Sequence, residues 1–372
     1  MTAPLRLLVV SHSLAGGGAE RFAATLARHL DRSRFAPELV LAVDRRAYAV
    51  PDDVPVHTLG YRGFLSLPRT LARLRRLLRA RRPRIVLSNV LSTSCLVGTA
   101  RLGLPDPPAW VARVGLAPAE GDPPLQRAWA RWLYPGAARL VGNSRGLAAA
   151  LGDLHPALRD RVVAAPNPTD FAALDRDAAA EPCRRARSGE HTLLSLGRLV
   201  RQKRPDLAVE TLAGAQATGT TRLWWAGEGP RTAATQRRAR RLGVADRLDL
   251  LGFVPRPFSL VRQADLFLST SDYEGLPNAL IETQGLGLAA VATRCPFGPE
   301  EVVEHGKTGL LVAPGDRDDL VRAVRELLAA PERRRAFGAA AAERARARFG
   351  LAATLPSWQD LLEDAAGVPG RV

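Results

Sequence analysis

The chain has 372 residues, of which 46% are hydrophobic and 24% are charged, and this apolar fraction excludes a mainly disordered polypeptide. A chain of this length exceeds what one hydrophobic core usually supports, so we expect two domains. Basic residues outnumber acidic ones by 53 to 37, giving a formal net charge of +16, and every basic residue except Lys203 and Lys307 is an arginine.

In the first half of the chain, short apolar runs alternate with helical patterns. We expect strands at residues 5–11, 37–43, 85–88, 110–114 and 139–142. Helical patterns occupy residues 19–30 and 67–82. Runs of valine, leucine and isoleucine separated by helices are typical of a parallel, doubly wound sheet.

The alternation lapses at residues 171–190, where we place a junction between a first domain, residues 1–170, and a second domain, residues 191–350. Strands of the second domain are expected at residues 193–196, 223–226, 248–251, 266–269, 290–292 and 310–312. Helices are expected at residues 204–214, 278–287 and 316–329. Residues 351–372 are expected to form a helical tail that can pack back on the first domain.

The predicted fold is therefore of the α/β class, with two Rossmann-like domains that face each other across a cleft. Each domain would be a doubly wound parallel sheet. Ligands of such sheets bind outside the carboxyl ends of the strands, so the motifs that follow the strands are the ones to examine for function.

Cysteine usage and hydropathy predict the compartment. The three cysteines, Cys95, Cys183 and Cys295, are far apart in the sequence and form no CxxC pair, which argues against a disulfide scaffold and against a clustered zinc site. The apolar run at residues 5–10 is too short for a signal peptide, and no stretch approaches the ~18–20 residues of a spanning helix. We expect a soluble cytosolic protein that can still touch a membrane.

The first motif is the glycine run Gly16, Gly17 and Gly18, which follows the first expected strand. Glycines let the backbone approach a ligand, and the helix that follows offers unpaired N–H groups. The spacing is not the dinucleotide G-x-G-x-x-G, and no acidic residue is clearly placed to bind a ribose. A ligand-binding loop and an ordinary turn are both open on spacing alone.

The second motif contains Arg198 and Lys203. Arg198 follows the first strand of the second domain, and Lys203 lies just before Pro205, a residue favoured in the first turn of a helix. A guanidinium and an ammonium beside a helix N-terminus suit a diphosphate. The alternative is two solvated cations in a loop, but a lysine in a chain that otherwise uses arginine favours the diphosphate site.

The third motif joins two glutamates, Glu274 and Glu282, through the turn Gly275, Leu276, Pro277 and Asn278. The turn would direct backbone N–H groups into the cleft, and two carboxylates can accept hydrogen bonds from the hydroxyl groups of a sugar and a ribose. The alternative is a surface glutamate followed by a helix-capping glutamate. We favour the functional interpretation because the sequence around Glu282 is small and apolar.

Other acidic residues have simpler explanations. Glu300 and Glu301 can complement a helix dipole, which we favour for Glu301, while a functional role stays open for Glu300. The Asp-x-Asp segments at residues 175–177 and 316–318 match a pattern that binds a metal ion in some enzymes. An acidic N-cap explains the second segment, and the first lies in the junction, so no metal site is expected.

Together these segments closely resemble the family 4 glycosyltransferases, which have the GT-B fold and retain the anomeric configuration of the sugar. The resemblance spans nearly the whole chain and is most specific in the second domain. The matching stretches are residues 16–21, 166–168, 197–203, 226–230, 251–254, 274–282, 295–302 and 305–312.

The resemblance implies a role for each motif residue. Arg198 and Lys203 would hold the donor diphosphate, Glu274 would bind the transferred sugar, and Glu282 would bind the ribose. The turn at residues 275–278 would bind the phosphates through its backbone. The loop at residues 16–18 would approach the donor across the cleft. Arg198, Lys203 and Glu274 are thus the expected catalytic residues.

One departure from the family pattern lies in the first domain. Many members carry a histidine in the loop that is Arg113-Val114-Gly115 in this chain. Some relatives have an arginine there, so Arg113 is a candidate residue for contact with the acceptor or the sugar.

The resemblance implies transfer of a hexose or N-acetylhexosamine from a nucleotide diphosphate sugar, with UDP favoured, to a glycan or a lipid-linked acceptor in bacterial surface polysaccharide synthesis. No metal or other cofactor is expected. A nucleotide-sugar epimerase or hydrolase on the same fold is the alternative enzyme. A basic nucleic-acid-binding protein is a third class, but aromatic residues are only 5% of the chain, and such proteins usually interleave aromatics with basic residues.

The positive charge is unevenly distributed. Residues 1–186 hold 27 basic and 15 acidic side chains, whereas residues 187–372 hold 26 and 22. Residues 69–84 alone contain eight arginines and no acid, opposite a stripe of leucines. A solvated helix and a surface attracted to anionic lipid are both open. A second candidate interface is the segment Trp129, Trp132, Leu133 and Tyr134, beside Arg127 and Arg131.

Overall fold

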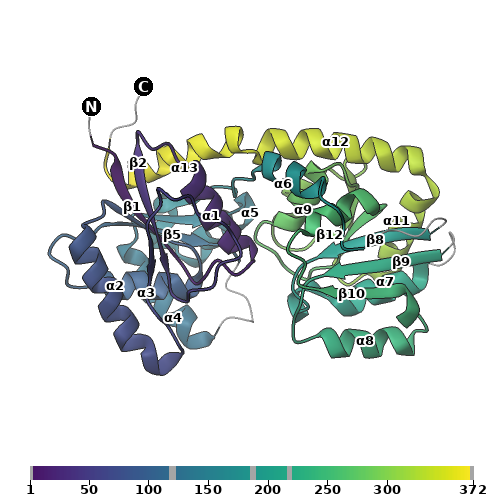
Figure 1. The fold of residues 1–372 in the computed structure, drawn as a ribbon, viewed down its shortest axis with the longest axis horizontal. Coiled ribbons are helices and arrows are strands. Elements are labelled where there is room, and N and C mark those ends of the chain that lie inside the picture. The colour runs from purple at the N-terminus through teal and green to yellow at the C-terminus, as the bar shows by residue number, and fades with distance from the viewer. Residues whose placement is uncertain (1–2, 117–122, 185–189, 216–219, 369–372) are drawn as a thin grey trace. The chain divides into compact units, whose positions relative to one another are not determined.

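Two parallel sheets, of seven and six strands, organise the residues that the computed structural model describes, which are 3–116, 123–184, 190–215 and 220–368 (Figure 1). The chain divides into two units. Unit 1 comprises Met1–Thr169 and Leu351–Val372, and unit 2 comprises Asp170–Gly350. Each unit is a sheet covered by helices, which confirms the predicted pair of Rossmann-like α/β domains.

The sheet of unit 1 has the strand order β3-β2-β1-β4-β5-β6-β7, with every pair parallel. Its strands are β1 (Leu5–Ser11), β2 (Phe35–Leu41), β3 (Val56–Thr58), β4 (Ile85–Ser88), β5 (Ala109–Val114), β6 (Arg139–Gly142) and β7 (Val162–Ala164). Strand β1, which lies between β2 and β4, is buried from Leu7 to Ser11. Strands covered on both faces need apolar residues at successive positions, which is why these strands are visible as apolar runs.

Helices α2, α3 and α4 form a layer in which α3 packs against both of its neighbours. The helices of unit 1 are α1 (Gly18–His29), α2 (Leu67–Arg81), α3 (Leu91–Arg101), α4 (Pro124–Leu133), α5 (Arg145–Leu154) and α13 (Leu351–Ala365), with short 3-10 helices η1 (Phe64–Ser66), η2 (Tyr134–Gly136) and η3 (Pro156–Arg161). Helix α13 packs against α1, where the Trp358 ring lies 4.8 Å from the Phe22 ring. Trp358 is fully buried and donates from Nε1 to the Pro166 carbonyl oxygen at 2.8 Å.

The sheet of unit 2 has the order β10-β9-β8-β11-β12-β13 and is also parallel. Its strands are β8 (Glu190–Leu196), β9 (Thr220–Ala226), β10 (Leu248–Gly252), β11 (Leu266–Ser269), β12 (Ala290–Thr293) and β13 (Gly309–Val312). Its helices are α6 (Phe171–Ala178), α7 (Pro205–Gly214), α8 (Thr232–Arg241), α9 (Asn278–Gly285), α10 (Pro299–Val302), α11 (Arg317–Ala329) and α12 (Pro331–Phe349), with 3-10 helices η4 (Arg201–Lys203), η6 (Ala245–Arg247) and η7 (Pro257–Gln263).

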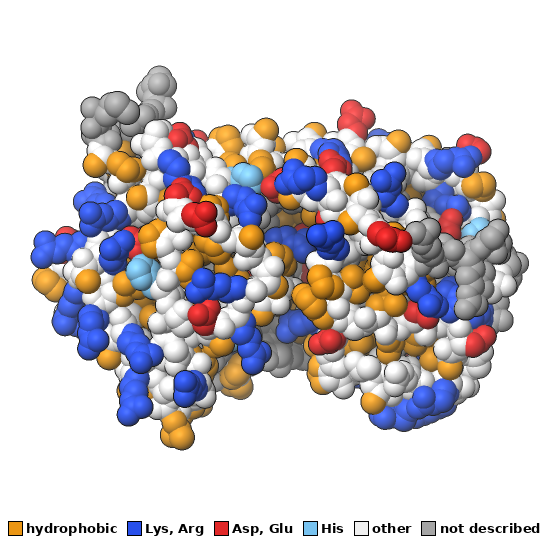
Figure 2. All heavy atoms as spheres, viewed as in Figure 1, with side chains coloured by type: hydrophobic (Ala, Val, Ile, Leu, Met, Phe, Trp, Pro, Cys, Tyr) orange, Lys and Arg blue, Asp and Glu red, His pale blue; other side chains and the backbone are white. Residues whose placement is uncertain are grey.

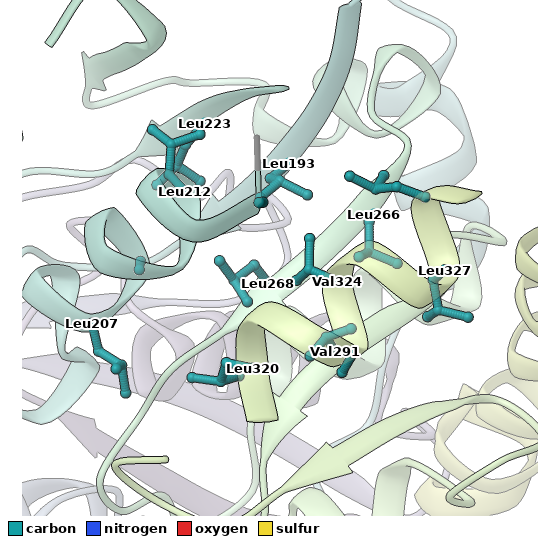
Figure 3. Close-up of a cluster of buried hydrophobic side chains, with 14 of the residues drawn as sticks. Leu193, Leu207, Leu212, Leu223, Leu266, Leu268, Val291, Leu320, Val324 and Leu327 are labelled. Atoms are coloured by element: carbon teal, nitrogen blue, oxygen red, sulfur yellow. The ribbon is translucent and has the colours of Figure 1, made fainter. Parts of the chain in front are cut away.

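Two hydrophobic clusters cover the two faces of the unit 2 sheet. Successive residues of a strand point to opposite faces, so Leu193 belongs to one cluster and Leu194 to the other. Figure 3 shows the first cluster, in which strand residues such as Leu193 and Leu268 lie beside Leu320 and Val324 of α11. This packing fixes the strands whose carboxyl ends lead into the motif loops.

Residues 171–178, which were predicted to belong to the junction, form helix α6 of unit 2. The Asp170 side chain caps this helix by accepting from the Ala173 N–H at 2.9 Å. Phe171 and Leu174 are buried, and a Cβ added to Gly285 would lie 1.9 Å from Cε1 of Phe171. A one-turn apolar spacing inside an Ala/Asp/Arg segment is too short a pattern to predict a helix. Among the described helices, none is long and apolar enough to cross a membrane.

Candidate functional site

The carboxyl ends of β8, β11 and β12 meet at one edge of the unit 2 sheet, because these strands are neighbours and parallel. The loops after these strands contain the predicted residues Arg198 and Lys203, then Glu274 and the turn at residues 275–278. These residues, far apart in the sequence, are therefore brought to one place by the order of the strands.

Lys203 and Glu274 form an ion pair, with 2.5 Å between Nζ and Oε1. The Glu274 side chain is only 7% exposed, and that of Lys203 is 24% exposed. Glu274 also accepts from Ser271 Oγ at 2.7 Å, and from Gln202 Nε2 at 3.4 Å. The surface-glutamate and solvated-cation alternatives thus fail for these two residues: the carboxylate is buried and hydrogen-bonded, and the ammonium is paired with it on a side chain that is mostly buried.

The backbone around Lys203 is held by contacts with the β11 loop. The Thr270 hydroxyl donates to the carbonyl oxygens of Lys203 and Arg204 at 2.9 and 3.0 Å. Arg204 has a left-handed backbone, with φ of 47°, and pairs with Asp272 at 2.9 Å. The Lys203 side chain passes close to Gly197, where an added Cβ would lie 3.5 Å from its Cε. Lys203 is therefore positioned by the fold before any ligand arrives.

The backbone of Glu274 is held from the other side by the loop after β12. Its N–H donates to the Pro296 carbonyl oxygen at 2.7 Å, and its carbonyl oxygen accepts from the Phe297 N–H at 3.0 Å. Burial, with a further contribution from the Glu274 charge, raises the pKa of the nearby Cys295 thiol to about 12. Cys295 is therefore a neutral packing residue at neutral pH.

The turn after Glu274 leads into helix α9. Gly275, Leu276 and Pro277 are buried, and Asn278 is the first residue of the helix. The first N–H groups of a helix lack intrahelical partners and favour negative charge. Glu282 lies in the middle of α9 and is 6% exposed, so it does not cap the helix.

Gly298, with φ of 90°, packs against the turn after Glu274: an added Cβ would lie 2.5 Å from the Gly275 carbonyl oxygen. Only glycine fits both this conformation and this contact. Two other glycines act similarly beneath the Arg198 loop, where Cβ atoms on Gly227 and Gly229 would lie 2.0 and 2.3 Å from backbone oxygens of that loop.

Arg198 differs from Lys203. Its side chain is exposed, and among the described residues no carboxylate pairs with it. The loop beneath it is fixed by the Leu199 N–H, which donates to the Glu228 carbonyl oxygen at 2.9 Å. Arg198 is therefore a cation on a defined backbone, available to an anionic ligand.

Gln202 and Ser271 were not among the predicted site residues, yet both donate to Glu274. Gln202 lies inside the second motif and Ser271 lies three residues before Glu274, so both were within quoted segments. The Gln202–Glu274 contact depends on the approach of β8 and β11, which local spacing does not encode, whereas Ser271 and Glu274 lie in the same loop after β11.

The predicted glycine loop lies in unit 1. Gly16 has φ of 120°, and Gly18 begins α1. A Cβ on Gly17 would lie 2.2 Å from Oε2 of Glu20. The Asn89 side chain, at the end of β4, donates from Nδ2 to the Ala19 carbonyl oxygen at 2.5 Å. The loop is thus fixed at the carboxyl edge of the unit 1 sheet.

Arg113 lies near the end of β5, at the same edge of the sheet, and is 1% exposed. It donates to the backbone and side-chain oxygens of Asn89 at 3.0 Å and to Oδ1 of Asn167 at 2.7 Å, and its guanidinium lies 4.3 Å from the Phe22 ring centre. Burial lowers its pKa to about 9, opposed by the charge of Glu20. Arg113, on β5, thus links the end of β4 to Asn167, near the end of the first segment of unit 1.

The remaining acidic candidates have structural partners. Asp316 caps α11, accepting from the Asp319 N–H at 2.9 Å, as predicted. Asp175 pairs with Arg346, and Glu300 pairs with Arg294 on the surface. Within the described ranges, no three histidine, cysteine or acidic side chains are grouped to hold a metal ion.

Two family models match the chain. Residues 17–168 match the model described as Glycosyl transferase 4-like domain, and residues 181–344 match that of Glycosyl transferases group 1. Among solved structures, the fold is similar to that of Anabaena Alr3699/HepE in complex with UDP and glucose, with a TM-score of 0.80 and 18% identity over 97% of this chain and 100% of that chain. At that identity the likeness establishes the fold.

Curated relatives are similar over shorter segments. The lipopolysaccharide core biosynthesis glycosyltransferase LpsD of Rhizobium meliloti is 28% identical over 46% of this chain and 49% of its own length. A GDP-mannose-dependent phosphatidylinositol monomannoside mannosyltransferase of Mycolicibacterium smegmatis is 33% identical over 46% of this chain and 48% of its own length. The chain thus matches about half of the length of these relatives.

Proposed function

Because the chain belongs to the GT-B glycosyltransferases of the family 4 type, we propose that it moves a hexose or N-acetylhexosamine from a nucleotide diphosphate sugar, with UDP favoured, to a glycan or lipid-linked acceptor. The observation that carries the proposal is the Lys203–Glu274 pair at the entrance to α9. The acceptor would belong to bacterial surface polysaccharide, and it would bring the protein to the membrane.

In this proposal the cations of the β8 loop stabilise the leaving group. The bond between the anomeric carbon and the diphosphate oxygen breaks, and the diphosphate keeps the electron pair. Lys203 and Arg198, with the first N–H groups of α9, would neutralise the charge that develops there. Because these groups are already positioned, they need no reorganisation during the reaction. With that much positive charge from the protein, no metal is required by the proposal.

The carboxylates would orient the donor. Glu274 accepts hydrogen bonds from three donors in this structure, and a sugar hydroxyl would donate to the same carboxylate while the Lys203 ammonium, held beside it, would face the diphosphate. Glu282 would accept from the ribose hydroxyls. The acceptor hydroxyl would attack on the face that the diphosphate leaves, forming the new glycosidic bond with retention and releasing one proton.

The nucleotide is testable by thermal stabilisation. A relative is named as GDP-mannose-dependent and a structural neighbour was solved with UDP, so both nucleotides enter the comparison with ADP. A ligand at ~100 times its dissociation constant stabilises the native state by about 2.7 kcal/mol. We expect UDP to raise the melting temperature more than GDP or ADP. An equal response to all three, or none, would contradict the donor assignment.

Product analysis tests the reaction itself. Incubation with UDP-glucose or UDP-N-acetylglucosamine and a lipid-linked or glycan acceptor should give a glycoside with the donor's anomeric configuration, visible by NMR. The control omits the acceptor. Free sugar or an epimer formed there at the full rate would identify a hydrolase or an epimerase instead.

A further inference from the structure

Large apolar side chains are exposed mainly in unit 1. Among the described residues, those more than half exposed are Leu65 at 97%, Leu125 at 85%, Phe64 at 81%, Trp132 at 66% and, in unit 2, Phe253 at 52%. The four in unit 1 come from η1, which leads into α2, and from α4. Both elements belong to the helical layer formed by α2, α3 and α4, and large apolar side chains left exposed there indicate an interaction surface.

Helix α4 is apolar on its exposed side as well as on its buried side. Ala130 and Leu133 are buried, whereas Leu125, Ala128 and Trp132 are exposed at the i, i+3, i+7 spacing of one helix face. The interface predicted at residues 129–134 is wrong for Leu133 and Tyr134, because both side chains belong to the core. Leu125 and Trp132 form the unpartnered apolar stripe instead.

Helix α2 places its unpaired arginines opposite its core side. Thr70, Leu74 and Leu78 are its buried residues. Arg69, Arg76 and Arg79 are exposed and follow Leu65 along the opposite side of the helix, and no ion pair to them is present among the described residues. Figure 2 shows basic side chains gathered along α2.

Other arginines of α2 are engaged by the protein. Arg81 pairs with Glu38 at 2.7 Å, Arg75 donates to the Leu102 carbonyl oxygen, and Arg73 donates to the Leu59 carbonyl oxygen at 2.8 Å. Acidic residues are missing nearby in the sequence: none occurs between Asp53 and Asp106, and α4 has none. The outer face of this helical layer therefore carries positive charge without compensation from its own helices.

Both apolar ends lie at the functional edge of the unit 1 sheet. Helices α2 and α4 follow the parallel strands β3 and β5, so their first turns lie at the carboxyl edge. Phe64, Leu65 and Leu125 belong to these first turns or directly precede them. The glycine loop and the end of β5 with Arg113 belong to the same edge.

We propose that this α2/α4 surface, formed by η1 and the outer faces of α2 and α4, docks on an anionic lipid bilayer. Phe64, Leu65, Leu125 and Trp132 would enter the interfacial region while the arginines of α2 contact lipid phosphates. A nucleic acid would account for the arginines but leave exposed leucines unexplained. Only the role of this docking rests on the proposed function: it would bring the carboxyl edge of the unit 1 sheet to a lipid-linked acceptor.

Vesicle co-sedimentation at 150 mM salt tests the docking. The full chain is mixed with vesicles of phosphatidylcholine alone or with ~30% phosphatidylglycerol. A triple variant, Arg69→Gln, Arg76→Gln and Arg79→Gln, should bind anionic vesicles about 100-fold more weakly, since each basic residue near such a surface contributes about five-fold. A double variant, Phe64→Ser and Leu65→Ser, should also weaken binding.

Helix α8 of unit 2 offers a matched control. Arg237, Arg240 and Arg241 are also exposed, and among the described residues no ion pair to them is present, but no large exposed apolar side chain lies on that helix. Their replacement by glutamine removes the same charge and should leave vesicle binding within two-fold of the wild type. Phe253→Ser is the matched control for the apolar pair.

Three outcomes would overturn the docking proposal. The wild type could show no preference for anionic vesicles, or the α2 and α8 variants could lose vesicle binding equally. The third is tight binding to RNA that depends on the α2 arginines while vesicle binding does not. Circular dichroism and melting temperatures establish that each variant is folded. Because no nucleotide sugar is present, the result is independent of the donor assignment, and stabilisation by UDP should be unchanged in the α2, η1 and α8 variants.

Discussion

Lys203 and Lys307 are the only lysines of the chain, and each forms an ion pair at 2.5 Å, but in opposite surroundings. Lys203 is 24% exposed and its partner Glu274 is 7% exposed, whereas Lys307 and its partner Glu304 are 72% and 40% exposed. Replacing each lysine by methionine keeps much of the side-chain length and removes one charge. The pair of variants thus separates a positioned cation from a solvated one.

The stability cost follows from burial. Opposite charges 2.5 Å apart attract by ~7 kcal/mol at an effective dielectric constant of about 20, but dehydration offsets most of this. Removing one member of a buried pair typically costs ~3–5 kcal/mol. Ser271 and Gln202 still donate to Glu274 in the variant, so we expect about 2 kcal/mol for Lys203→Met. For a domain the size of unit 2 this lowers the melting temperature by ~4–8 °C.

The effect on ligand binding should be larger than the effect on folding. Loss of a hydrogen bond to a charged group costs ~1.5–3 kcal/mol, so Lys203→Met should weaken UDP binding about 10- to 100-fold. The rate of donor cleavage should fall further, by ~100- to 1,000-fold, because the leaving diphosphate loses a preorganised cation. Calorimetric titration with UDP and the release of UDP from UDP-glucose measure the two effects.

Lys307→Met should leave the melting temperature nearly unchanged, as for other exposed pairs, with UDP affinity and donor cleavage unchanged. A folded Lys203→Met variant that binds UDP and cleaves the donor as the wild type does would refute the assignment of Lys203. Equal losses in both lysine variants would show instead that net charge, and not position, governs donor binding.

Two further predictions follow from perturbed ionisation. At pH 8.5 iodoacetamide should label the exposed Cys183 of the native chain and spare Cys295, since burial raises its pKa to about 12; labelling of both at equal rates would contradict this. Burial raises the pKa of Glu38, but hydrogen bonds from Arg81 and His57 lower it more, so it stays below 4.5. The stabilisation of the native state by this carboxylate is therefore present above the unfolded-state pKa of Glu38 and is lost as the pH falls through its folded-state pKa. Glu38→Gln should lower the free energy of unfolding by about 1–2 kcal/mol at pH 7, and by less at acidic pH, as measured by urea denaturation at each pH.

The sheets could be predicted from the sequence because parallel strands are buried on both faces. Leu193 and Leu194 are both core residues, so the whole strand is apolar and stands out from its surroundings. Edge strands lack this pattern. Strand β3, Val56–Thr58, is only partly buried, and three residues with one histidine indicate no strand without the neighbouring β2.

The candidate site was predictable only in part. Arg198, Lys203 and Glu274 lie in motifs that follow strands, so their sequence positions pointed to the carboxyl edge. The contacts of Lys203 and Gln202 with Glu274 depend on β8 lying next to β11. These two strands are neighbours in the sheet although two other strands separate them along the chain. Local sequence patterns carry no information on that order.

The burial of Trp358 in unit 1 has a consequence for the order in which the chain is completed during synthesis. Unit 2 is one uninterrupted stretch, Asp170–Gly350, whereas unit 1 requires Leu351–Val372 in addition to its first 169 residues. The core around Phe22 therefore stays open until α13 has left the ribosome. Although domains generally fold in order from the N-terminus, here the N-terminal unit closes last, after unit 2 has all of its residues.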